Sequence, residues 1–211
     1  MLDGLIGVQN SVNFWLFAET VRRRSTGAAG GSPVRAKSLV VFPRIAVAAM
    51  LPAILCAARV GDLVPSLAPA VDTLRLLLVA FPFLVVGAIE LYARSGEGRN
   101  RSVIWVTILG LIVNVGLNLT LLSTVGLVGA GWALLGSELV QVVALWRIGQ
   151  PHERELLRPV VRDVLVYGGL LLVVAVALNV GQVPLAAVGA VTLVGLLTVR
   201  AAPLSLKGRL A

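Results

Sequence analysis

Residues 102–146 carry a single formal charge, Glu138, in a stretch of about 45 residues. Each half of the stretch is long enough to cross a hydrocarbon core of roughly 30 Å at about 1.5 Å per residue. Residues 123–126 hold a serine and a glycine, which are typical of a turn between the two halves. The stretch therefore predicts two transmembrane helices that enter and leave the membrane on the same side.

The composition of the whole chain favours an integral membrane protein. Hydrophobic residues make up 58% of the 211 residues and charged residues only 13%, which is about half the share of a soluble domain. We expect an all-α fold of about seven transmembrane helices, although Gln9, Asn10 and Asn13 interrupt the first apolar run. The runs are residues 5–18, 39–58, 74–92, 103–125, 127–146, 164–180 and 183–199.

The basic residues alternate from loop to loop, although a net charge of +8 alone could suggest nucleic acid. Sixteen of the eighteen fall on one predicted side, and only Arg59 and Arg75 fall on the other. By the positive-inside rule, the chain lies in the cell membrane with its N-terminus outside and its C-terminus in the cytoplasm. The sixteen are Arg22, Arg23, Arg24, Arg35, Lys37, Arg44, Arg94, Arg99, Arg101, Arg147, Arg154, Arg158, Arg162, Arg200, Lys207 and Arg209.

Small and amide residues form two stripes with a period of four, which is one face of a helix. Small residues let helices approach closely, and amides can then hydrogen-bond across the contact, so the stripes predict interhelical packing. A role for Asn114 and Asn118 in a transport path is the alternative. The first stripe is Gly110, Asn114 and Asn118, and the second is Gly129, Ala133, Ser137 and Gln141.

Three charged residues within or near the apolar runs are further candidates. Glu138 lies well inside its run, where a carboxylate can couple transport to an ion or stay neutral or paired with an amide. Glu90 and Arg94 have the spacing and order of a helical ion pair. Arg44 either extends its guanidinium to the cytoplasmic interface or lines a cavity that receives phosphate.

Four elements occur in an order that resembles the C-terminal part of Wzx-like polysaccharide-biosynthesis flippases, within the multidrug/oligosaccharidyl-lipid/polysaccharide exporter superfamily. They are AP followed by LRLL at residues 68–77, a small basic loop at 94–101, Asn114 with Asn118, and GLVGA at 126–130. The resemblance extends over residues 39–147 and is weaker in the two final runs.

The resemblance implies about twelve to fourteen spans arranged in two lobes around a central cavity. The seven runs then correspond to the eighth to fourteenth spans, so a preceding N-terminal lobe, or a second half-transporter, is an expected partner. The expected organisation is a first span and basic linker (1–36), C-terminal-lobe helices (37–147), a cytoplasmic loop (148–163) and two final spans with a basic tail (164–211).

The function implied is translocation of a polyprenyl-pyrophosphate-linked saccharide for cell-surface polysaccharide export, with membrane lipids as surroundings. A MATE-like cation or drug antiporter and a non-transporting scaffold or inactive remnant are the alternatives. The sequence has no phosphate loop, metal-ligand cluster or nucleophile-base pair, so we expect no enzyme, cofactor or metal. The transport-path candidates are Arg44, Glu90, Asn114, Asn118, Glu138 and Gln141.

Overall fold

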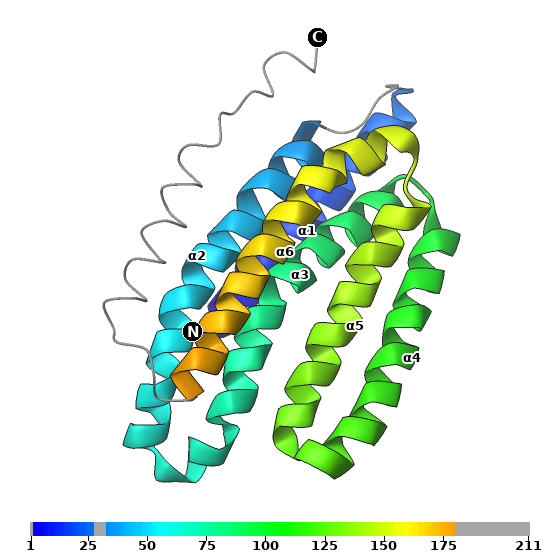
Figure 1. Ribbon diagram of the computed structural model, residues 1–211. Coiled ribbons are helices and arrows are strands. Elements are labelled where there is room, and N and C mark those ends of the chain that lie inside the picture. Colours follow the sequence, from blue (N-terminus) through cyan, green and yellow to red (C-terminus); the bar gives the residue numbers. More distant parts are fainter. Residues whose placement is uncertain (1, 28–32, 180–211) are drawn as a thin grey trace.

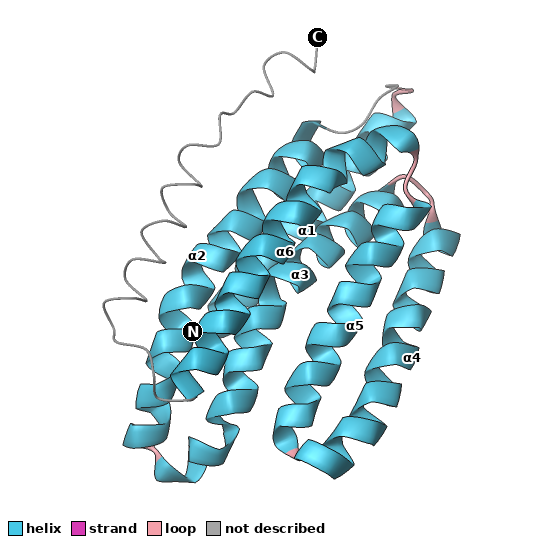
Figure 2. Cartoon of the chain, viewed as in Figure 1, coloured by secondary structure: helices cyan, strands magenta, loops and turns pink. Residues whose placement is uncertain are grey.

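The computed structural model describes residues 2–27 and 33–179, and these two ranges contain helices joined by short loops, without a strand (Figure 2). The predicted all-α class is therefore confirmed. The predicted seventh run and the basic tail lie outside the described residues. The helices are α1 (Leu2–Ser25), α2 (Pro33–Leu63), the 3-10 helix η1 (Pro65–Ala70), α3 (Val71–Gly96), α4 (Asn100–Val125), α5 (Leu127–Ile148) and α6 (Pro151–Asn179).

Consecutive long helices run in alternating directions, with α3 at the centre of the bundle (Figure 1). Helix α3 packs against α1, α2, α5 and α6, whereas α4 has α5 as its main neighbour. The inner side chains of α3, such as Val79, Phe83 and Val86, are spaced three or four residues apart and are almost fully buried. Helix α4 lies at the edge of the bundle and exposes apolar side chains along its length, including Ile112 and Leu119.

Four helical segments are long and apolar enough to cross a membrane: Val34–Leu63, Pro65–Gly96, Asn100–Val125 and Leu127–Ile148. They correspond to the second to fifth predicted runs. Helices α1 and α6 contain the first run and most of the sixth, but neither is among these four segments. In α1 the polar Asn13 and Thr20 are buried within the bundle, so part of this helix meets protein. Seven spans are thus not confirmed.

Two predicted loops are shorter in the structure than in the sequence-based prediction. Helix α2 begins at Pro33, so Arg35 belongs to its first turn and not to the linker predicted within residues 1–36. Helix α6 begins at Pro151, so most of the predicted loop at 148–163 is helical. Proline suits a first helical position because its fixed φ matches the helix and its missing N–H would have no intrahelical partner there.

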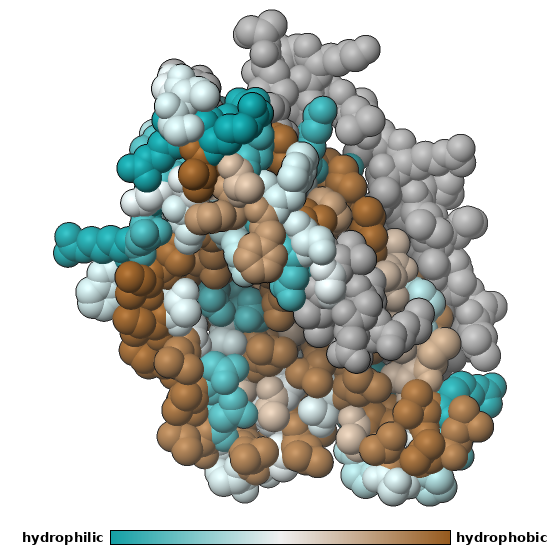
Figure 3. All heavy atoms as spheres, turned by 180° about the vertical axis from the view of Figure 1, so that it is seen from behind, coloured by the Kyte–Doolittle hydropathy of each residue, from teal (hydrophilic) through white to brown (hydrophobic). Residues whose placement is uncertain are grey.

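The loops divide between the two ends of the bundle. The ends of α1, α3 and α5 lie together at the upper end in Figure 1, and the α2–α3 and α4–α5 connections lie at the lower end. We call the upper end the basic end, because the predicted basic loops lie there, while Arg59 and Arg75 lie toward the other end. Figure 3 shows hydrophilic atoms gathered near the basic end and apolar atoms over much of the remaining face.

Candidate functional site

Glu90 lies at the centre of a buried ion network at the basic end. The predicted pair with Arg94 is confirmed, since Arg94 Nε donates to Glu90 Oε2 at 3.2 Å. Arg35 of α2 also donates two hydrogen bonds to this carboxylate, from Nε to Oε1 at 2.9 Å and from Nη2 to Oε2 at 2.6 Å. All three side chains are buried. The pair predicted within α3 therefore also joins α3 to α2.

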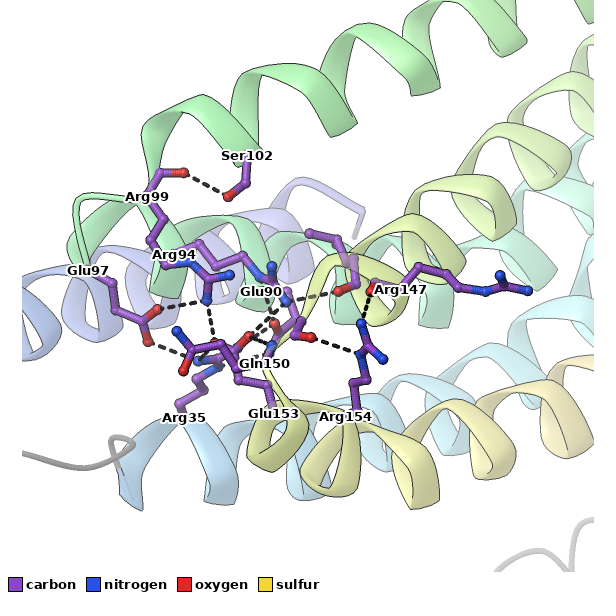
Figure 4. A network of polar contacts seen from close by, with 12 residues as sticks. Arg35, Glu90, Arg94, Glu97, Arg99, Ser102, Arg147, Gln150, Glu153 and Arg154 are labelled. Atoms are coloured by element: carbon purple, nitrogen blue, oxygen red, sulfur yellow. Dashed lines mark hydrogen bonds and ion pairs between the residues drawn. The ribbon is translucent and has the colours of Figure 1, made fainter.

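Glu153, in the first turn of α6, connects the same network to a third helix and to the α3–α4 loop (Figure 4). Its Oε1 accepts hydrogen bonds from Arg99 at 2.6 Å and Arg35 at 3.1 Å, and its Oε2 accepts one from the Gln150 backbone N–H at 2.8 Å. Arg35 Nη1 also donates to Glu97 at 2.9 Å. The ion network consists of Arg35, Glu90, Arg94, Glu97, Arg99 and Glu153.

The ion network contains equal numbers of guanidinium and carboxylate groups, which offsets the cost of burying charge. Burial raises the pKa of Glu153, but its hydrogen bonds from Arg99 and Gln150 and the charges of Arg35 and Arg94 lower that pKa from 4.5 to about 2. Glu153 is thus ionised at neutral pH. The network can fix α2, α3 and α6 relative to one another, and it leaves the Glu90 carboxylate occupied by protein donors.

The C-terminal end of α5 is also held by arginines. Its last carbonyl groups have no intrahelical donor, so other groups have to satisfy them. Arg94 Nη2 donates to the Leu145 carbonyl at 2.9 Å, and Arg154 donates to the carbonyls of Gly149 and Arg147 at 2.8 and 2.6 Å. Arginine contacts at the basic end therefore join four helices, α2, α3, α5 and α6.

Arg44, for which the sequence left two roles open, forms an ion pair with α6 and lines a small cavity. Its Nη2 donates to Asp163 of α6 at 3.1 Å, and both side chains are 22% exposed. The two residues lie at similar depth, eleven and twelve residues after the first residue of their helices. The neighbouring cavity between α2 and α6 has a volume of about 40 Å³, room for about three water molecules.

The predicted stripes meet between α4 and α5. Asn114 Nδ2 donates to Ser137 Oγ at 3.1 Å across the two helices, and Asn118 Nδ2 donates to Asn114 Oδ1 at 3.0 Å. On α5, Gln141 Nε2 donates to Glu138 Oε1 at 3.4 Å. We call these five residues the polar seam. The Asn114–Ser137 hydrogen bond crosses between the helices, as the packing alternative predicted, whereas the bonds of Asn118 and Gln141 each lie within one helix.

Glycines bring the helices close at the polar seam. A Cβ atom on Gly110 of α4 would lie 2.5 Å from Gln141 Cδ, so a larger residue there would displace the amide. A Cβ atom on Gly87 of α3 would lie 3.7 Å from Glu138 Oε2. Glu138 therefore lies where α3, α4 and α5 approach one another. Gln141 supplies its only hydrogen bond among the described residues.

The structure brings four of the six candidates together, namely Asn114, Asn118, Glu138 and Gln141, and places Glu90 and Arg44 in separate ion pairs. The sequence analysis missed the partners that the fold supplies. One signal was available in the sequence, since several acidic residues lie in or beside the basic segments. The positive-inside rule, which explains the basic residues, does not require acidic residues there. The missed partners are Arg35, Glu97, Arg99, Glu153 and Asp163.

Comparison of the chain with protein-family models, with curated proteins and with solved structures found no match. Functional inference therefore rests on the resemblance in the sequence and on the geometry of the polar seam and the ion network.

Proposed function

We propose that the chain is part of a flippase that moves a polyprenyl-pyrophosphate-linked saccharide from the cytoplasmic to the outer leaflet of the cell membrane. The sequence elements that resemble such flippases fall at the η1–α3 junction, the α3–α4 loop, the middle of α4 and the start of α5. In this proposal the basic end faces the cytoplasm, in agreement with the positive-inside rule.

The observation that carries the proposal is the position of Glu138. It lies inside a helix long and apolar enough to cross a membrane, and a single amide is its hydrogen-bond partner among the described residues. An ionisable group at such a depth costs at least about 2.5 kcal/mol, so it normally serves a pathway or a specific contact. We assign Glu138 the role of contacting the coupling ion or the saccharide.

The ion network has a mechanical role in the proposal. Alternating access needs rigid bodies that rock against each other around a site. Contacts among Arg35, Glu90 and Glu153 join α2, α3 and α6 into one such body. The second body is an N-terminal lobe or a second half-transporter, which completes the path for the lipid-linked saccharide.

The proposal is tested in the native host, where every partner of the chain is present. The gene is deleted, or replaced by alleles encoding Glu138→Gln or the matched control Glu155→Gln, in which an exposed carboxylate of α6 changes. We expect the deletion and Glu138→Gln to lower surface polysaccharide and to accumulate the lipid-linked saccharide in the cytoplasmic leaflet. The control should match the wild type.

Unchanged polysaccharide export after deletion would refute the proposal. Increased accumulation of cationic drugs in the same strain would favour the antiporter. A third outcome is loss of export on deletion with full export by Glu138→Gln, which would favour a non-transporting scaffold. Two observations support the scaffold alternative, namely the extent of the ion network and the close packing at Gly110.

A further inference from the structure

A groove with a volume of about 600 Å³ opens on the outside of the bundle at the basic end. It lies between the first turns of α4 and the last turns of α5, and the α3–α4 loop forms its upper edge. Ser102, Val106 and Ala144 are among its lining residues. The groove is separate from the polar seam, which begins further along α4.

Arginines lie at the upper edge of this groove. Arg99 and Arg101 both line it. Arg99 uses Nη1 for its contacts with Glu97 and Glu153. Its Nε and Nη2 donors have no partner in the part of the chain that the structure describes. Arg101 is exposed, and within residues 2–27 and 33–179 no side chain pairs with it. Donors for an anion are therefore available.

The local charge balance leaves a positive surplus at the groove. The ion network is neutral, since its carboxylates match its guanidinium groups. Among the described residues neither Arg101 nor Arg24 of α1 has a carboxylate partner, so each adds a positive charge. The Arg24 guanidinium lies against Gly98, where an added Cβ atom would collide with it. Gly98 has a φ of +75° and itself lines the groove.

Below the arginines the groove is apolar. Trp105, Leu109 and Ile148 line it, and each is at least 40% exposed. From Ser102 to Leu109 the lining extends over about 10 Å along α4. Tryptophan and arginine are both favoured at the boundary between headgroups and hydrocarbon. A ligand for this groove needs an anionic head and an apolar tail.

We infer that this groove binds an anionic phospholipid, with its phosphate at Arg99 and Arg101 and one acyl chain along Trp105 and Leu109. The charge surplus selects an anionic headgroup, and the apolar lining supplies contact for the chain. The first amide groups of α4 point toward the same end and add to the attraction. Lipid binding in this groove does not require translocation, so either this inference or the proposed flippase function can be refuted without the other.

The inference is tested with the purified full chain in neutral detergent, by counting bound lipids with native mass spectrometry. The probes are long-chain phosphatidylglycerol, long-chain phosphatidylcholine and inorganic phosphate. We expect Arg101→Gln to weaken phosphatidylglycerol binding about fivefold, since one arginine near a lipid surface contributes about 1 kcal/mol. The matched control is Arg158→Gln, an exposed arginine of α6 that does not line the groove.

A second variant, Ala144→Phe, fills the apolar part of the groove and should weaken the binding of long-chain phosphatidylglycerol while Arg101 stays in place. Three results would overturn the inference. Equal weakening of phosphatidylglycerol binding by Arg101→Gln and Arg158→Gln would indicate general surface charge. Displacement of bound phosphatidylglycerol by inorganic phosphate would indicate an anion site alone. Unchanged lipid binding by Ala144→Phe would exclude the acyl-chain contact.

Discussion

Replacing the buried Arg35 by glutamine should destabilise the bundle more than replacing an exposed arginine of the same helix. Arg35 donates four hydrogen bonds to three carboxylates, Glu90, Glu97 and Glu153, from a side chain that is 3% exposed. The variant would leave the buried cluster with one carboxylate more than its guanidinium groups can compensate. That excess negative charge has little access to solvent.

The expected loss can be estimated from this geometry. Removing one partner of a buried ion pair costs about 3–5 kcal/mol because the other charge stays buried. Arg94 and Arg99 remain beside the carboxylates, at 3.2 Å from Glu90 and 2.6 Å from Glu153, so the lower end of that range applies. A loss of about 3 kcal/mol corresponds to roughly a 150-fold increase in the unfolding equilibrium constant.

The assay is equilibrium unfolding of the purified chain in mixed micelles, followed by tryptophan fluorescence as the denaturing detergent increases. The control is Arg59→Gln, which changes an arginine of the same helix whose side chain is 78% exposed. The double variant Arg35→Gln with Glu90→Gln restores charge balance and should lose about 1–3 kcal/mol less than the sum of the single losses. An Arg35→Gln loss no larger than that of Arg59→Gln, or strict additivity, would refute the reasoning.

Two further predictions concern pH and packing. The folded-state pKa of Glu153 is lowered to about 2 from 4.5, so its contribution to the free energy of unfolding is present above pH 4.5 and is lost as the pH falls toward 2. Glu153→Gln should flatten the dependence of unfolding free energy on pH in that window, as measured by the same unfolding assay. The same flattening with the exposed Glu155→Gln would contradict this explanation. Gly129→Ala should lower the thermal unfolding temperature, because the new Cβ would lie 2.6 Å from the Leu121 backbone. Gly116→Ala, with open space around it, should not lower that temperature, and equal effects would disprove the packing explanation.

Contacts within one helix, and the contact between the two helices joined by the turn at Gly126, were predictable from the sequence. Glu90 and Arg94 are four residues apart, so helical geometry alone brings them together. The stripe containing Asn114 meets the one containing Ser137 because a single turn at Gly126 folds the two helices against each other. Both predictions needed only the helix period and the position of a turn.

Contacts between residues far apart in the sequence were not predictable in this way. Arg35 is 55 residues from Glu90, and Arg44 is 119 residues from Asp163. The sequence left open whether Arg44 reaches the membrane interface or lines a cavity, and it gave no sign that Asp163 would be its partner. A charge near the end of an apolar run has many possible partners until the neighbouring helices are known.

The sequence by itself determined that the chain is helical and that several of its helices are long and apolar enough to span a membrane. The reason is local: a backbone in hydrocarbon has to satisfy its own hydrogen bonds, and about twenty apolar residues do so as a helix. Only the tertiary structure decided which charged and polar groups meet. It enclosed Glu90 within the ion network and left Glu138 with one amide partner among the described residues, because the packing of α3 against α2, α5 and α6 fixes which side chains share a low-dielectric space.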